Sequence, residues 1–293
     1  MASIPTSSLS SSPFPHLPVC KVTIPNTPLI NAAHSYIKEH CSASTVNHCL
    51  RSTVFAVILL RKIPPFSTAT ADIDTETLVL SVLLHDMGWA TTKALVSMDK
   101  RFEVDGGNIA RDFILAKTKV SGTQPAGDNL NPHNIDVSQE WDKHRLQLVW
   151  DSIALHTTPS IAHHKEPEVF ATQLGIMCDF FGPNMPGGGG EDEDRESGSG
   201  NSVPLITVDE YKEVVAKFPR LGFKDDLVSI LCGLCRDKPA TTMDNFVSEY
   251  GKLYGLDGKG GGCAEWRERC EKNNIARRLM GGLTACAQWD NNE

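Results

Sequence analysis

Residues 84–89 read LHDMGW, and they hold the pair of side chains that most clearly offers chemistry. His85 and Asp86 are adjacent near the end of a predicted helix, where consecutive side chains point about 100° apart around the axis. An ion beside that edge can bind an imidazole nitrogen and a carboxylate oxygen together. Gly88 lets the helix end and lets a ligand approach the backbone closely. A His-Asp pair alone is weak evidence for a metal, because surface and capping pairs of this kind are common.

Three more side chains that could take part in such chemistry lie on other predicted helices. His48 lies in the segment NHCLR, and His156 follows WDSIAL at the end of a later helix. Asp179 lies in the apolar segment GIMCD, where a buried carboxylate needs a partner such as a metal ion. Alone, His48 would be interpreted as a core histidine and Asp179 as half of a salt bridge. With the pair at 85–86, the chain carries the order H…HD…D.

Helical patterning surrounds all of these residues. Ser44 or Thr45 can cap a helix that runs through Leu60, and Asp74 can cap one over 75–85. We expect further helices at 102–116, 141–155, 167–181, 208–217, 224–236, 242–254 and 264–278. No segment alternates apolar and polar residues over a useful strand length. The sequence therefore predicts an all-α fold.

Composition shifts divide the chain into a main domain and three other segments. Residues 1–26 are rich in Ser and Pro, which predicts disorder. Residues 184–203 include the run GGGGEDEDRESGSGNS, which predicts a solvated acidic insertion. We therefore expect one domain over 27–254 with that insertion, and a C-terminal extension over 255–293 that forms one helix.

The overall composition is that of an ordinary soluble globular protein. The 293 residues are 40% hydrophobic and 22% charged, with a net charge of −8. This acidity argues against partners that need a cationic surface, so we expect neither nucleic acid nor membrane binding. Half of the net charge belongs to residues 191–196, so the acidity says little about a substrate.

Cysteine usage and the ends of the chain predict a cytoplasmic protein. Nine cysteines are an odd number and fit a reducing compartment better than a disulfide framework. The pair in Cys232-Gly-Leu-Cys235 lies in an apolar helical run and is interpreted as core rather than as a redox or zinc pair. The first basic residue is Lys21, and no secretory signal is apparent.

The order H…HD…D resembles that of the HD superfamily of metal-dependent phosphohydrolases and their relatives, whose fold is all-helical. The intervening residues look like the fungal HD-type cyanamide hydratase family over about residues 26–254. The segments that carry this resemblance are NHCLR at 47–51, LHDMGW at 84–89, RFEVDGGNIAR at 101–111, HRLQLVWDSIALHTTPSI at 144–161 and GIMCDFFGP at 175–183. The resemblance implies a helical bundle around one metal site, with His48, His85, Asp86 and Asp179 as ligands.

The resembled family also implies a reaction. Its members are lyases that hydrate the C≡N bond of cyanamide to urea through a metal-bound hydroxide, with Zn²⁺ as the expected ion and Fe²⁺ left open. His156 is then the expected proton donor, and Thr157 the residue that orients substrate or water. Trp89 and Phe102 would form a small apolar wall, and Glu103 would bind the amino group of the substrate.

Two departures from the wider superfamily narrow the chemistry. Phe102 stands where many two-metal members carry a further His, which favours one ion. Trp89 stands where a Lys is common, and the loss of that cation argues against phosphoester chemistry. The alternatives that stay open are hydration of another small nitrile or isocyanide, HD-type phosphohydrolysis, di-iron oxygenation, and metal binding without activity. The expected partner is a small nitrile-type substrate, and a homo-oligomer is left open.

Overall fold

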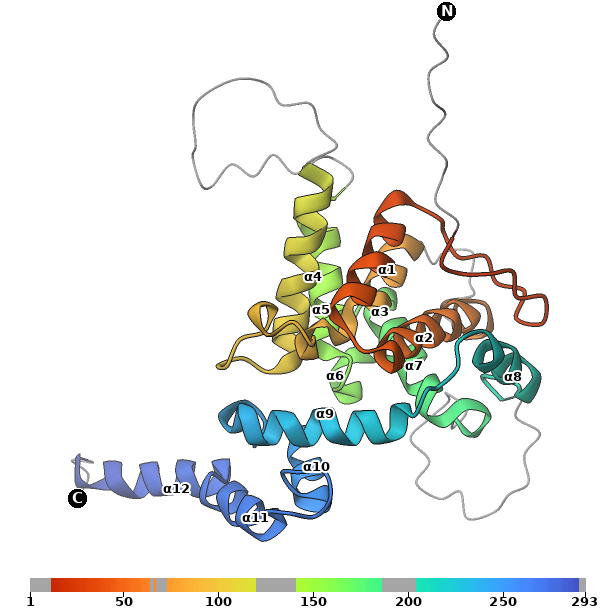
Figure 1. Ribbon diagram of the computed structural model, residues 1–293. Helices are drawn as coiled ribbons and strands as arrows, with labels where there is room; N and C mark the ends of the chain where they lie inside the picture. The colour runs from red at the N-terminus through yellow and green to blue at the C-terminus, as the bar shows by residue number, and fades with distance from the viewer. Residues whose placement is uncertain (1–11, 64–65, 67–72, 120–140, 186–203, 290–293) are drawn as a thin grey trace, which may run out of the picture. The chain divides into compact units, whose positions relative to one another are not determined.

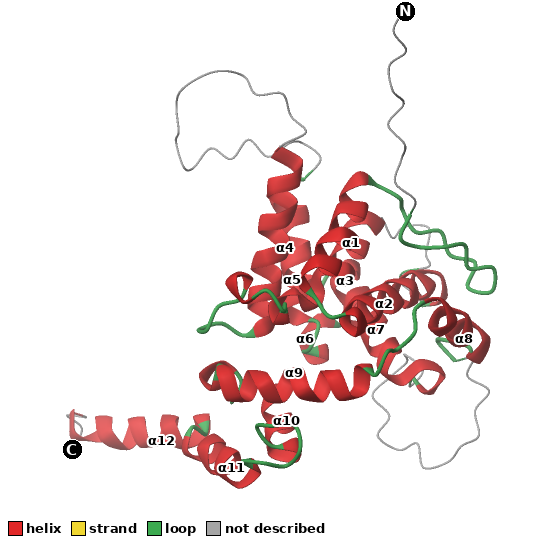
Figure 2. Ribbon diagram, viewed as in Figure 1, coloured by secondary structure: helices red, strands yellow, loops and turns green. Residues whose placement is uncertain are grey.

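The computed structural model describes residues 12–63, 66, 73–119, 141–185 and 204–289. In these ranges the chain forms helices and loops without any strand, which confirms the predicted all-α fold (Figures 1 and 2). The chain divides into two compact units, and each unit is described by itself. The first comprises Met1–Val96 with Phe102–Leu221, and the second comprises Ser97–Arg101 with Gly222–Glu293.

The first unit contains the helices that the sequence predicts around the candidate metal ligands. Its elements are α1 (Pro28–His40), α2 (Ala43–Lys62), α3 (Thr75–Leu84), η1 (His85–Trp89), η2 (Lys93–Leu95), α4 (Phe102–Lys119), α5 (Lys143–Leu155), α6 (Pro159–Ala162), α7 (Pro167–Phe181), η3 (Gly182–Asn184) and α8 (Val208–Lys217). Helix α1 was not predicted. Its signal is Thr27, whose side chain accepts a hydrogen bond from the backbone nitrogen of Ile30, followed by Pro28 in the first turn.

The second unit contains α9 (Phe223–Asp237), η4 (Pro239–Thr241), α10 (Val247–Tyr254), α11 (Cys263–Lys272), α12 (Ile275–Cys286) and η5 (Ala287–Trp289). The predicted domain runs to residue 254, whereas the compact units divide after Leu221. The C-terminal extension forms two helices where one was expected. The break lies at Asn273 and Asn274, because the Asn274 side chain accepts a hydrogen bond from the backbone nitrogen of Arg277 and so begins α12.

The segment before α1 differs from the disorder expected for residues 1–26. Phe14, Leu17 and Cys20 are buried in the core of the first unit. The Glu213 carboxylate of α8 accepts a hydrogen bond from the backbone nitrogen of Cys20 at 2.8 Å. Composition failed as a guide here because a few apolar residues among the prolines are enough to hold an irregular segment against helices. Residues 1–11 and most of the acidic insertion lie outside the described residues.

Helix α2 is the central element of the first unit. It packs against α7 and α3, and its residues from Ser44 to Leu59 are buried almost without interruption. A helix that is buried on every side is a core helix. Among the described residues, α2 alone is long and apolar enough to cross a membrane, but 83% of its most apolar window is buried within the fold.

A glycine sets the close approach of α7 to α2. A Cβ atom at Gly175 would lie 2.5 Å from the Cβ of Ala56 and 2.8 Å from its Cα. This contact lies between His48 and the end of α2, and one turn before Asp179 on α7. The two helices therefore bring their polar residues together only while position 175 has no side chain.

We predict that Gly175→Ala destabilises the protein by about 1–3 kcal/mol, because the added methyl group must push apart two packed helices. Gly233→Ala on α9 is the matched control, since a Cβ there meets only the end of the Arg236 side chain at 3.6 Å. That control should be neutral or stabilising by up to about 1 kcal/mol, as expected for Ala in a helix. Urea unfolding of both variants measures the difference, and equal stabilities would contradict this account of the α2–α7 contact.

Candidate metal centre

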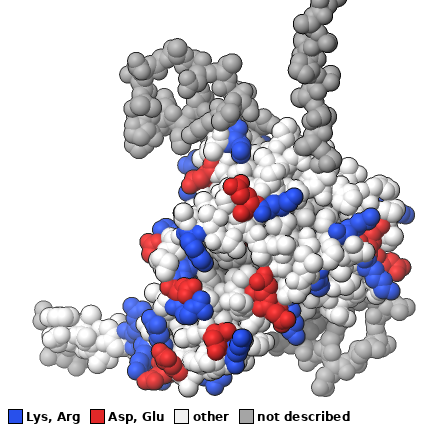
Figure 3. All heavy atoms as spheres, in the orientation of Figure 1, with Lys and Arg blue, Asp and Glu red and all other residues white. Residues whose placement is uncertain are grey.

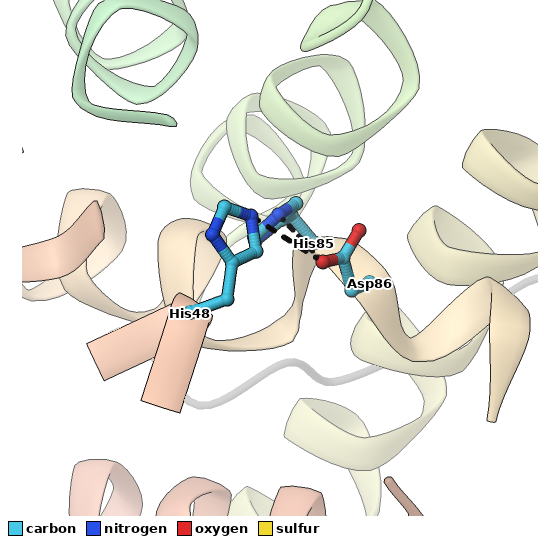
Figure 4. A group of neighbouring side chains, drawn as sticks. All are labelled: His48, His85 and Asp86. Carbon is cyan, nitrogen blue, oxygen red and sulfur yellow. Dashed lines mark ion pairs between the residues drawn. The ribbon is translucent and has the colours of Figure 1, made fainter. Parts of the chain in front are cut away.

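Three of the four predicted metal ligands lie together inside the first unit (Figure 4). His48 comes from α2, and His85 and Asp86 come from η1. One ligand atom from each lies within 4.8 Å of the others. The Asp86 Oδ2 atom is 3.0 Å from His85 Nε2 and 3.6 Å from His48 Nε2. All three side chains are buried, so this cluster could hold a metal ion away from solvent.

Each histidine is fixed by a hydrogen bond at its Nδ1 atom. His85 Nδ1 donates to the carbonyl oxygen of Val82 at 2.7 Å, and His48 Nδ1 donates to Asp179 Oδ2 at 2.7 Å. A proton held on Nδ1 leaves the Nε2 lone pair of a neutral imidazole exposed to a metal ion. Burial also lowers the pKa of His48, which favours this neutral form. Both rings therefore present Nε2 toward Asp86.

The Asp86 carboxylate tests whether these residues fit a metal ion. Both of its oxygen atoms are buried, and neither takes part in a hydrogen bond. A carboxylate in this situation has lost its hydration without protein donors to replace it, which is unfavourable unless a cation binds there. Two imidazole nitrogens and a carboxylate oxygen form a donor set that suits Zn²⁺ and Fe²⁺ alike. The residues present therefore fit a divalent ion.

Asp179 lies on the other side of His48, outside this cluster. Besides accepting from His48, its carboxylate accepts from Arg51 Nε at 2.7 Å and from Arg51 Nη2 at 2.8 Å. Arg220 adds a contact to the Asp179 Oδ1 atom at 3.2 Å. Burial alone would raise the pKa of Asp179, but the hydrogen bonds from His48 and Arg51 hold it well below its usual range. In this arrangement Asp179 orients His48, and its role as a fourth ligand stays a prediction.

Arg51 is the residue of this centre that the sequence analysis missed. It lies three residues after His48 on α2, and its side chain is fully buried. An arginine on the same side of an apolar helix as a candidate ligand needs a buried acid, and the GIMCD segment supplies one in Asp179. The sequence predicted that the Asp179 carboxylate needs a partner, and the same argument could have identified Arg51 as that partner.

The residues expected to act on the substrate also gather beside His85. Trp89 and Phe102 stack with their ring centroids 5.0 Å apart. The His156 ring meets the Phe102 ring edge-on at 5.7 Å and the His85 ring at 4.9 Å. Thr157 Oγ1 donates to Glu103 Oε1 at 2.8 Å. The structure thus brings all five predicted substrate and proton-transfer residues to one side of the cluster.

Two glycines allow this gathering, because they let η1 touch the first turns of α4. A Cβ atom at Gly88 would lie 1.6 Å from the carbonyl oxygen of Phe102. A Cβ atom at Gly106 would lie 2.9 Å from the carbonyl oxygen of His85. Neither position can carry a larger residue unless the backbones separate. The glycines thus hold the metal ligands of η1 against the residues that begin α4.

His156 is neutral in this environment. Its Nδ1 atom donates to the carbonyl oxygen of Ile153 at 2.6 Å, which leaves Nε2 as a hydrogen-bond acceptor. Burial and the neighbouring His85 lower the pKa of His156 to about 4. In the resting protein His156 is therefore a proton acceptor. The donor role expected from the sequence requires that it first take up a proton.

The Asp86 carboxylate, which makes no hydrogen bond, leads to a prediction about stability. We expect Asp86→Asn to stabilise the metal-free protein by about 1–3 kcal/mol, because the amide is uncharged and can donate to His85 Nε2. The same variant should lose the stabilisation by Zn²⁺, which in the wild type is about 4 kcal/mol at a thousandfold excess over the Kd.

Thermal unfolding with chelator and with Zn²⁺ measures both effects of Asp86→Asn. Asp179→Asn serves as the comparison, and it should destabilise the metal-free protein because it leaves Arg51 buried beside an uncharged amide. A wild-type zinc response in Asp86→Asn would contradict the assignment of this carboxylate as a ligand.

The lowered pKa of His156 predicts a loss of stability in acid. An unfolded His titrates near 6.5 and the folded one near 4, so the unfolded state binds more protons between these values. The contribution is complete above pH 6.5 and is lost as the pH falls toward 4. We expect His156→Gln to remove up to about 3 kcal/mol of this dependence in the metal-free protein. The exposed His164→Gln is the control, and identical pH profiles for the two variants would contradict the assignment.

Neither a scan against models of known protein families nor a search of curated proteins gives a match to this chain.

Proposed function

We propose that this protein is a metal-dependent hydro-lyase of the HD type, which adds water across the C≡N bond of cyanamide to give urea. The observation that carries the proposal is the buried Asp86 carboxylate, which makes no hydrogen bond and lies between two histidines whose Nε2 atoms face it. The resemblance of the surrounding segments to the fungal cyanamide hydratases supports the choice of reaction.

The donor set of His48, His85 and Asp86 would hold the ion. A divalent ion bound by such residues supplies an activated water at neutral pH. The chain itself must then exclude bulk water, orient a small substrate and move protons. Each of these tasks has a candidate residue beside His85.

The stacked rings of Trp89 and Phe102 fit a compact, linear substrate. They would form an apolar wall on one side of the centre, and an uncharged molecule of few atoms could lie against it. The other residues gathered there are His156, Thr157 and Glu103, none of which is a cation at neutral pH. Apart from the metal ion, a phosphate group would therefore find no cation among these residues. This contrast favours a nitrile over a phosphoester.

His156 has the protonation state that hydration requires. As water attacks the nitrile carbon, the neutral Nε2 atom can accept a proton from that water. The resulting imidazolium then donates the proton to the nitrile nitrogen, where negative charge develops. One C–O bond and one N–H bond form, which gives isourea, and a second proton shift from oxygen to nitrogen gives urea.

Glu103 and Thr157 act as one unit in this proposal. Because the Thr157 hydroxyl donates to Glu103, it fixes the orientation of that buried carboxylate. Glu103 can then accept a hydrogen bond from the amino group of cyanamide. Thr157 keeps a lone pair that can accept from water. Both residues would contribute through positioning rather than through proton transfer.

The test is urea formation from cyanamide by purified protein of measured metal content. We expect a rate proportional to bound metal, and a loss of about 10²–10⁴-fold in kcat for His156→Gln, which removes the proton acceptor. Glu103→Gln should raise KM more than it lowers kcat. His164→Gln is the control and should leave the rate unchanged. If no urea forms at any metal loading, the proposed reaction is wrong.

A second candidate reaction uses the same centre. The stacked rings of Trp89 and Phe102 would contact only the apolar part of a substrate, so another small nitrile or an isocyanide could lie against them. Parallel assays with such compounds and with a phosphomonoester separate the candidates. Activity toward a nitrile other than cyanamide would change the proposed substrate but support the proposed mechanism. Release of phosphate would contradict both the substrate and the mechanism.

A further inference from the structure

Helix α12 in the second unit leaves an apolar face uncovered. None of its residues is buried within the described part of the chain. Ile275, Leu279 and Leu283 follow one another at four-residue intervals, and each is at least 60% exposed. Met280 and Trp289 are exposed to the same degree. Soluble surfaces rarely leave so many large apolar side chains together without a partner.

The length of α12 also indicates that something else stabilises it. It has 12 residues, and isolated helices of that length are marginal in water even when their composition favours a helix. Gly281 and Gly282 lower its intrinsic stability further. A helix of this kind becomes stable when its apolar face is buried, and the described residues do not bury it.

The charge around α12 selects the kind of partner. From Ile275 to Trp289 the chain carries two arginines and no acidic residue, and Asp290 and Glu293 follow this window. The window therefore differs from the whole protein, whose net charge of −8 led to the expectation of no membrane binding. The start of α12 lines a groove of about 900 Å³ with the cationic side chains of Lys252, Arg267, Arg269 and Arg278. Asp244 and Glu271 are its acidic residues. Figure 3 shows Lys and Arg side chains on this part of the second unit, with Asp and Glu side chains beside them.

Two of these arginines are available to an anion. Arg277 pairs with Glu271 at 2.5 Å, and Lys252 pairs with Glu249 at 2.7 Å. Among the described residues no acid pairs with Arg269 or Arg278. The groove is therefore a site where anionic groups can bind next to the apolar face.

We propose that α12 is an amphipathic helix that binds the surface of an anionic lipid membrane. Its apolar side chains would enter the boundary between headgroups and acyl chains, and Trp289 would lie at the interface. Lipid phosphates and carboxylates would occupy the basic groove, where each cation adds to the attraction. The proposal concerns a reversible contact by one helix, and it is independent of the reaction proposed for the metal centre.

A second copy of the chain is the competing partner. A stable dimer interface uses about 20–30 residues on each side. Helix α12 offers four large exposed apolar side chains and η5 adds Trp289, which is too few to hold two chains together. A membrane needs no matching surface, so a single short helix is enough for weak binding. The cationic groove also favours an anionic surface over a second copy of the same groove.

Vesicle sedimentation with the full-length protein tests the proposal. We expect binding to phosphatidylcholine vesicles that contain about 30 mol% phosphatidylserine, and weaker binding to pure phosphatidylcholine. The double variant Leu279→Asp with Leu283→Asp should abolish binding. Val208→Asp is the matched control, because Val208 is an exposed apolar residue at the start of α8, where an acid is favourable. The double variant Arg269→Gln with Arg278→Gln should weaken binding about tenfold.

Tryptophan fluorescence supplies a second readout. Anionic vesicles should shift the emission to shorter wavelength, and Trp289→Phe should remove that shift. Failure of the wild type to bind anionic vesicles would overturn the proposal, and so would binding that survives the two Asp substitutions. A concentration-dependent doubling of mass that those substitutions abolish would show that a second copy covers α12 instead.

Discussion

The buried contact among Arg51, Asp179 and His48 is the interaction on which the candidate metal centre depends. A fully buried guanidinium and a fully buried carboxylate are each unfavourable alone, and their two hydrogen bonds make both tolerable. The same carboxylate fixes the proton of His48 on Nδ1. One ion pair thus joins α2 to α7 and sets the tautomer of a candidate ligand. Loss of either charged partner would disturb the fold and the centre together.

Around this contact, the first unit is organised by close approaches between backbones. Gly175 lets α7 lie against α2, and Gly88 and Gly106 let η1 lie against α4. The ligands of η1 therefore have a fixed position relative to His48 and relative to the wall of Trp89 and Phe102. Rigid elements support both sides of the cluster, which is the arrangement that a precise metal site requires. The apolar residues of α2 and α3 supply the core that holds these elements in place.

The sequence predicted the helices well where a cap and an apolar period agreed. The helix that Asp74 caps and the helix that begins at Pro167 are examples, and both appear in the structure. The cluster of His48, His85 and Asp86 was predictable because the adjacent pair on one element and a histidine on another follow the order of the resembled superfamily. The partners of Asp179 were harder to predict. From the sequence alone, either Arg51 or a metal ion could neutralise this buried carboxylate.

Other features depended on long-range contacts that local patterns do not report. The segment around Leu17 lacks helical or strand periodicity and is held by helices that follow much later in the sequence. The break before α12 depends on one Asn cap within a run of polar residues. Helices α9 and α10 belong to the same compact unit as α11 and α12, so this unit begins at Gly222. Composition alone placed the boundary after residue 254.

The Asp86 carboxylate, which makes no hydrogen bond, also has a consequence for the lifetime of the protein in a cell. A chain that holds a buried carboxylate without hydrogen-bond donors unfolds more often than the same chain with an ion bound, and proteases act on the unfolded fraction. The abundance of the protein would then follow the supply of the metal, with no dedicated sensor. Newly made chains that acquire an ion would persist, and those that do not would be removed. The feature that suits this site for chemistry would also make it a checkpoint for correct assembly.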